Sequence, residues 1–169
     1  MNHLFYLSSA TAVAAAFMAV TRRRAMHALL YLVVSFLAVA AVFFSLGAAF
    51  AGILEVIVYA GAIVVLFVFV VMVLGLGEGA AAGERMGLGR GAWRGPSTLA
   101  ALLLAELAYA AWRAHGGVTS GEMTGPKDVA LALFGPYLLG VEIASFLLLA
   151  GMVGAFHLGS HVRDKGGEP

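Results

Sequence analysis

Residues 53–75 read ILEVIVYAGAIVVLFVFVVMVLG, and this stretch decides the fold. Between Val56 and Leu74 it has no charged residue, and its only strongly polar atom is the hydroxyl of Tyr59. A helix of about 20 residues crosses a hydrocarbon core about 30 Å thick. Membrane-spanning strands are about 10 residues long and alternate in polarity, which this stretch does not do. The sequence therefore predicts a membrane-spanning helix with a carboxylate, Glu55, at its entrance.

The composition extends this prediction to the whole chain. Of its 169 residues, 62% are hydrophobic and 11% are charged, whereas a soluble domain is about half apolar and about a quarter charged. We therefore expect one all-α integral membrane domain over residues 1–169. The net charge of +1 offers no basic face for nucleic acid. The chain has no cysteine, so it forms no disulfide and ligates no iron–sulfur cluster through cysteine.

Five apolar segments predict five transmembrane helices, over residues 4–20, 28–49, 53–74, 97–112 and 136–158. The fourth is short and carries Glu106 near its middle. The link Gly47–Gly52 has room only for a tight turn, so the second and third helices should be antiparallel neighbours. The stretches 75–96 and 113–135 are glycine-rich with scattered charges and are predicted to be loops.

Arginine and lysine positions predict the orientation. The first apolar run precedes Arg22, Arg23 and Arg24, which favours a retained helix over a cleaved signal. With five helices and an outside N-terminus, eight basic residues lie in the cytoplasm: Arg22, Arg23, Arg24, Arg85, Arg90, Arg94, Arg163 and Lys165. Only Arg113 and Lys127 then lie outside. The count would be the same if residues 97–112 did not cross, so it leaves the fourth helix open.

Three acidic residues, Glu55, Glu106 and Glu142, lie in or beside apolar segments. Carboxylates within a membrane are costly and mark functional sites by default. Glu55 and Glu142 fall near the outer ends of their helices, where an interfacial carboxylate is an equally good interpretation. For Glu106 we favour a role in local structure.

Glu55 and Tyr59 are four residues apart, which places them on one face of an α-helix. Ala62 and Leu66 continue that line. A carboxylate and a phenol on one stripe suit a hydrated proton path. Tyr59 as an ordinary packing residue fits the spacing as well, and the spacing alone favours packing.

The waist Ala60-Gly61-Ala62 allows two interpretations. Small residues let another helix approach closely, and this is the simpler one. The flanking β-branched residues lower helix propensity, so Gly61 could also permit a π-bulge, an irregularity common at functional sites.

Other motifs give little support for chemistry. His157 and His161 are spaced like a metal-binding pair, but they lack a third ligand, and we expect no metal site. The glycine-rich runs lack the flanking strand of a nucleotide-binding loop. The sequence shows no hydrolytic constellation, and we expect no catalytic residue.

Two long segments, residues 27–76 and 134–159, resemble a known family. The segment LEVIVYAGAIVVLFVFV (54–70) is the most specific part of the match. The family is subunit J of the bacterial proton-pumping NADH–quinone oxidoreductase, respiratory complex I, whose mitochondrial counterpart is NADH dehydrogenase subunit six. The resemblance implies five transmembrane helices and a place in the membrane arm of that complex.

The resemblance also implies a mechanism for the third helix. In this family a π-bulge at the positions of Tyr59, Ala60 and Gly61 relaxes to regular α-helix between states of the enzyme. That relaxation rotates the inner half of the helix and changes the hydration of a carboxylate-lined path from the quinone cavity. A physical mechanism fits this sequence, in which the rotation swaps apolar side chains such as Val64, Val65 and Phe67 for one another along the path. Glu55 and Glu142 match family glutamates, whereas Glu106 and His161 match no family motif.

By the same resemblance, the chain is a non-redox subunit that binds no cofactor itself. FMN, iron–sulfur clusters and the quinone substrate then belong to the complex as a whole. The implied partners are subunits A, H and K, the antiporter-like subunits and lipid, in a hetero-oligomer of the bacterial inner membrane. Two alternatives remain: a passive scaffold of the same complex, or a subunit of a related cation/proton antiporter or membrane hydrogenase.

Overall fold

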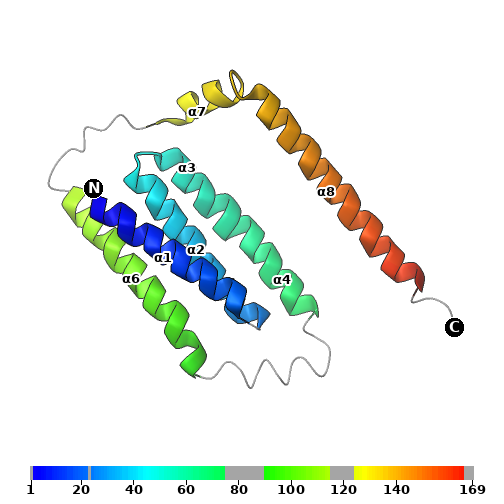
Figure 1. Ribbon diagram of the computed structural model, residues 1–169, viewed down its shortest axis with the longest axis horizontal. Helices are drawn as coiled ribbons and strands as arrows, with labels where there is room; N and C mark the ends of the chain where they lie inside the picture. The colour runs from blue at the N-terminus through cyan, green and yellow to red at the C-terminus, as the bar shows by residue number, and fades with distance from the viewer. Residues whose placement is uncertain (1, 23, 75–89, 115–123, 166–169) are drawn as a thin grey trace. The chain divides into compact units, whose positions relative to one another are not determined.

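The computed structural model describes residues 2–22, 24–74, 90–114 and 124–165, and every regular element among them is a helix. The chain divides into two compact units, Met1–Thr124 and Gly125–Pro169. The first unit holds α1, α2, α3, η1, α4 and α6, and the second holds α7 and α8 (Figure 1). The expected all-α class is confirmed, and the single membrane domain stays a prediction.

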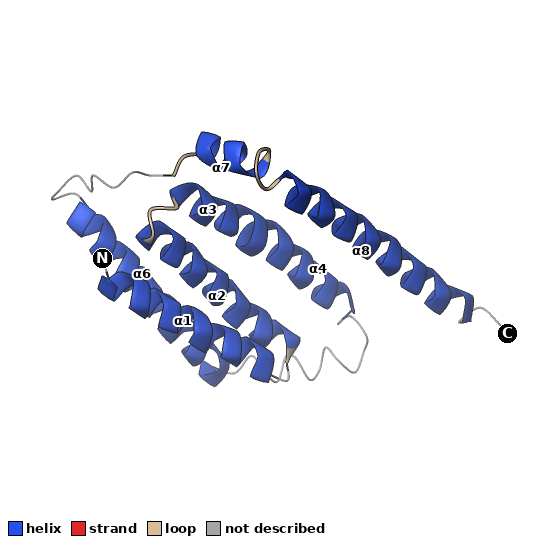
Figure 2. Ribbon diagram, turned by 45° about the horizontal axis from the view of Figure 1, so that its top comes forward, coloured by secondary structure: helices blue, strands red, loops and turns tan. Residues whose placement is uncertain are grey.

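The first unit is built around α2 (Ala25–Ser45). This helix packs against α1 (Asn2–Thr21) and α6 (Arg90–Ala114). It also packs against a continuous helix made of α3 (Ala49–Leu54), η1 (Glu55–Ile63) and α4 (Val64–Leu74), which we call the third helix. Figures 1 and 2 agree that α2 lies between α1 and the third helix.

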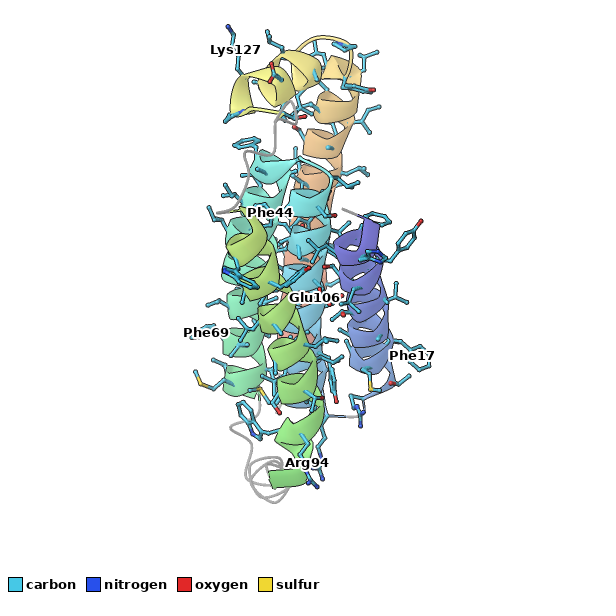
Figure 3. The ribbon with its side chains drawn as sticks, turned by 90° about the vertical axis from the view of Figure 1, so that its left-hand side faces the viewer. Phe17, Phe44, Phe69, Arg94, Glu106 and Lys127 are labelled. Carbon is cyan, nitrogen blue, oxygen red and sulfur yellow. The ribbon has the colours of Figure 1, made fainter. Side chains whose placement is uncertain are left out.

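Small residues let the helices of the first unit approach closely. Ala12 of α1, Ala38 and Ala41 of α2 and Leu103 of α6 form one buried cluster. Phe44, near the end of α2, and Arg94, near the start of α6, lie at opposite ends of the bundle, so these two neighbouring helices run in the same direction (Figure 3).

The second unit consists of α7 (Pro126–Leu133) and α8 (Leu138–Lys165), which contact each other. Pro126 stands at the start of α7, where its missing N–H costs nothing. The Asp128 carboxylate (Oδ2) accepts a hydrogen bond of 3.0 Å from the backbone N–H of Gly125. The apolar side chains of α8 are exposed along the helix, as expected for a helix that faces lipid or other proteins.

Four described helices are long and apolar enough to cross a membrane: His3–Thr21, Ala25–Ser45, Ala49–Val73 and Leu138–Gly159. They correspond to the first, second, third and fifth predicted segments. The fourth predicted segment, 97–112, is helical and forms the larger part of α6. Glu106 and the polar residues at the start of α6 lower its hydropathy, so α6 is not among the four. The membrane-protein class is confirmed, whereas the fifth crossing and the orientation stay predictions.

The predicted boundary between the second and third helices is wrong. α2 ends at Ser45 and not at 49, and residues Ala49–Gly52 are already helical. Gly47 adopts a φ of 78°, a conformation that glycine reaches without steric cost. The N–H of Ala48 donates to the carbonyl of Phe43, and that of Gly47 to Phe44. These two bonds form a Schellman motif, which terminates α2 earlier than hydropathy indicates.

Both predicted loops are also shorter than expected. Residues 90–96 belong to α6, with Pro96 inside the helix. A side chain at Gly95 would overlap the Tyr31 hydroxyl, so the close approach of α6 to α2 favours helix here despite a glycine and a proline. Residues 113–114 are helical, and 126–133 form α7. The remaining loop residues, 75–89 and 115–123, lie outside the described residues.

Candidate functional site

The third helix changes its hydrogen-bond register in its middle. Residues Glu55–Ile63 form a π-helix, and the N–H of Val64 donates to the carbonyl of Tyr59, five residues back. A regular α-helix bonds four residues back. The irregular backbone expected around Tyr59, Ala60 and Gly61 is therefore present, and it extends further toward the start of the helix than those three residues.

Gly61 supports this register from within its own helix. A Cβ added there would lie 3.2 Å from the carbonyl oxygen of Val56, and no described atom of another helix lies within 4 Å. Close packing by another helix is the role of Gly52 instead. At that residue a Cβ would lie 3.1 Å from the carbonyl oxygen of Ala40 and 3.2 Å from the Phe44 ring. Within the described chain, the waist is thus a site of altered register, and no other described helix packs against Gly61.

Tyr59 contacts α2 through its ring, while much of its surface is exposed. Its ring lies 5.4 Å from the Phe36 ring, with the two planes tilted by 53°, and 46% of Tyr59 is exposed. Such ring pairs contribute about 0.5–1.5 kcal/mol beyond the area they bury. Tyr59 therefore has an aromatic contact on one side and is free to meet water or a partner on the other.

Glu55 is the first residue of the π-helix and is half-buried. The predicted line from Glu55 through Tyr59 to Ala62 and Leu66 assumed α-helical geometry. A π-helix has more residues per turn than the 3.6 of an α-helix, so positions seven and eleven apart no longer coincide. The structure keeps Glu55 and Tyr59 one turn apart and breaks the line beyond them.

Two adjacent valines mark the end of the π-helix. Val64 is only 2% exposed, whereas Val65 is 63% exposed. Successive residues of an α-helix are separated by about 100° around the axis, because 3.6 residues complete a turn. A return to four-back bonding would therefore move Val64 into the angular position that Val65 holds and Ile63 into that of Val64. The contrast in burial of the two valines shows which one faces inward in this state.

Glu106 is the residue whose burial was missed. It is 5% exposed on α6, and its Oε2 accepts a 2.8 Å hydrogen bond from the Ser8 hydroxyl of α1. Figure 3 shows Glu106 on the α6 side of the bundle. The available signal was a lone carboxylate within an apolar helix together with a serine in another apolar helix, but nothing local to residue 106 identifies that serine.

The remaining predicted residues belong to the second unit. Glu142 is exposed on α8. His157 also lies on α8, while the side chain of His161 is outside the described residues. The parts of the chain that are described contain no group of three or more His, Asp or Glu residues that could hold a metal ion.

Comparison with known proteins gives a consistent result. A family model described as NADH-ubiquinone/plastoquinone oxidoreductase chain 6 matches residues 15–158. A Pseudomonas aeruginosa protein, NADH-quinone oxidoreductase subunit J, is 52% identical over 160 residues, which cover 94% of this chain and 96% of the relative. The Escherichia coli K12 protein of the same name is 49% identical over 163 residues, covering 96% and 89%. One from Buchnera aphidicola subsp. Acyrthosiphon pisum is 44% identical over 160 residues, covering 95% and 94%.

Proposed function

The chain belongs to the NADH-ubiquinone/plastoquinone oxidoreductase chain 6 family, and from this we propose that its third helix couples quinone reduction to proton translocation in respiratory complex I. Its relatives are named as subunits of NADH-quinone oxidoreductase, which supports a membrane-arm subunit in a hetero-oligomer. The single observation that carries the coupling role is the π-helix Glu55–Ile63 inside an otherwise regular membrane-spanning helix.

The mechanism is a change of register. Relaxation of the π-helix to α-helix returns the bonds to four residues back and removes one surplus residue from the turn. The part of the helix beyond Ile63 then rotates by about 100° relative to α3. Ile63 then bonds to the Tyr59 carbonyl in place of Val64 and takes the inward position, and Val64 moves to the exposed position that Val65 held. This exchange wets or dries a proton path that Glu55 and Tyr59 border.

In this proposal the chain itself changes its helix register and borders the proton path. FMN, the iron–sulfur clusters and the quinone site are assigned to other parts of the complex, and no catalytic residue or cofactor is assigned to this chain. Expected neighbours are subunits A, H and K and the antiporter-like subunits, in the bacterial inner membrane. Glu142, exposed on α8, is a further carboxylate for an outer-side contact.

We also propose that α6 is a fifth crossing, with the N-terminus outside and the C-terminus in the cytoplasm. α6 runs beside α2 from Gly95, which meets Tyr31, to Leu103, which packs on Ala38 and Ala41. A helix that accompanies a membrane-spanning helix in this way shares its depth. A cysteine introduced at Ser120 should react with an impermeant thiol reagent added outside, and labelling from the cytoplasm alone would refute the crossing.

Conservative variants of the site test the coupling role. Glu55→Gln and Tyr59→Phe keep the size of each side chain and remove the titratable carboxyl or the hydroxyl. We expect fully assembled complexes whose quinone-reductase activity and proton pumping both fall. Asp128→Asn, in the exposed helix α7, is the control and should leave both unchanged.

A passive scaffold predicts the reverse pattern, in which these variants alter assembly or nothing at all. The antiporter or hydrogenase alternative is separated by native purification. Flavin-containing, NADH-oxidising subunits should copurify with this chain, and their absence from an intact complex would exclude respiratory complex I.

A further inference from the structure

The contact between α1 and α6 holds a carboxyl group that the proposed gate does not use. Glu106 is 5% exposed, and Ser8, whose hydroxyl donates to Oε2 over 2.8 Å, is 2% exposed. The second oxygen, Oε1, is buried and has no hydrogen-bond partner in the described chain. Buried polar groups are normally hydrogen-bonded, so this oxygen requires an explanation.

Neighbouring polar groups do not supply a partner. The Thr11 hydroxyl donates to the carbonyl of Leu7 in its own helix at 2.9 Å. The Ser35 hydroxyl donates across to the carbonyl of Ala12 at 3.0 Å. The apolar cluster that includes Leu103 lies one turn before Glu106 on α6. Among the described residues, the buried carboxyl group thus has one hydrogen-bond donor, the neutral hydroxyl of Ser8.

The cations with described side chains on the packed helices are distant or exposed. Arg94 on α6 is twelve residues before Glu106, about 18 Å along the helix. Arg22, fourteen residues after Ser8, lies 5.2 Å from the Tyr31 ring at the other end of the bundle. Arg24 and His27 lie at that same end, at the start of α2. His3 is five residues before Ser8, about 7.5 Å along α1, and is exposed.

We propose that Glu106 is a proton-binding site, separate from the third helix, and that the closed α1–α6 contact holds it as the neutral carboxylic acid. Oε2 is then the carbonyl oxygen that accepts from Ser8, and Oε1 carries the proton. A buried carboxylate without a cation is costlier than a neutral acid with one unpaired hydroxyl. Binding transfers one proton from a hydronium ion of the solvent to Oε1, leaving water, and release returns the proton to water.

Release of that proton requires water beside Oε1, because no described cation is near enough to stabilise the ionised carboxylate. Water reaches this oxygen when α1 and α6 separate at the end of the bundle nearer His3. The protonation state of Glu106 and the closure of this contact are therefore linked. The site does not depend on the third-helix gate, since it lies on α1 and α6.

Infrared spectroscopy of the assembled complex at neutral pH tests the site. In the difference spectrum of native minus Glu106→Gln complex, we expect one C=O stretching band of a protonated carboxylic acid. Ser8→Ala should shift that band to higher wavenumber, because the carbonyl oxygen loses its donor. Asp128→Asn, an exposed carboxylate on α7, should leave the band unchanged.

Two outcomes would overturn the proposal: loss of a carboxylate band in Glu106→Gln in place of the acid band, or no change in either region. If Glu106→Gln fails to assemble, the Ser8→Ala shift decides alone, and an unshifted acid region refutes the site. Neither result bears on the third helix, which is tested by Glu55, Tyr59 and Gly61 variants.

Discussion

The two sides of α2 differ in how firmly they hold their neighbours. On one side, α1 and α6 pack through small residues, and side-chain hydrogen bonds of Ser35 and Ser8 cross the contacts. On the other side, the third helix meets α2 at Gly52, the Phe36–Tyr59 ring pair and the α4 contact. Most side chains of its π-helix are exposed.

This difference indicates on which side of α2 a change of helix register breaks fewer contacts. A helix locked by buried hydrogen bonds along its length cannot rotate without breaking them. The third helix has its close contact near its start, at Gly52, and a ring contact at Tyr59. The coupling proposal needs this division, with a close contact in the first half of the helix and a second half that turns.

Among variants on the two sides of α2, we expect the largest effect on proton pumping from Gly61→Leu in the third helix. The new side chain starts 3.2 Å from the Val56 carbonyl and biases the helix to one register. We expect proton pumping in the assembled complex to fall at least about tenfold, which corresponds to about 1.4 kcal/mol. Gly151→Leu on α8, where a Cβ meets open space, is the matched control. Intact turnover and pumping in Gly61→Leu would remove the mechanical role.

Gly52→Leu should instead damage packing. Its side chain would meet both the Ala40 backbone and the Phe44 ring, and overpacking of this kind costs about 1–3 kcal/mol. We expect a lower melting temperature and less assembled complex, with near-normal pumping per assembled complex. Thermal denaturation of the purified complex measures the first effect. The comparison would fail if Gly52→Leu matched Gly61→Leu in both stability and pumping.

The smallest effect is expected for Ser35→Ala on the firmly packed side. The variant loses the hydrogen bond to the Ala12 carbonyl, worth about 0.5–1.5 kcal/mol, and the alanine fits the vacated space. Melting temperature should fall slightly and pumping should be unchanged. A selective loss of pumping in Ser35→Ala would show that the α1–α2 contact also moves during turnover.

Much of the fold could be predicted because apolar runs in a membrane protein are long and bounded by charges. The ends of helices could not be placed as well. α2 stops at a Schellman turn of Gly47, and α6 starts before Pro96 because Gly95 packs on Tyr31. Both outcomes depend on contacts and backbone angles that hydropathy does not record.

The candidate site could likewise be predicted only in part. Gly61 among β-branched residues indicated a possible π-bulge, whereas the full extent of the π-helix depends on bonds over nine residues. The burial of Glu106 could not be inferred from its neighbours, because its hydrogen-bond donor, Ser8, is 98 residues away in the chain. The difference in burial between Val64 and Val65 likewise depends on the helix register, because the two side chains are identical.

The most direct test of the coupling role is the backbone register of residues 55–66 in the complete complex, determined by electron cryomicroscopy at rest and during turnover. The account predicts five-back bonds with Val64 inward in one state, and four-back bonds with Ile63 inward and Val64 turned outward in the other. The same register and the same inward residue in both states would contradict it.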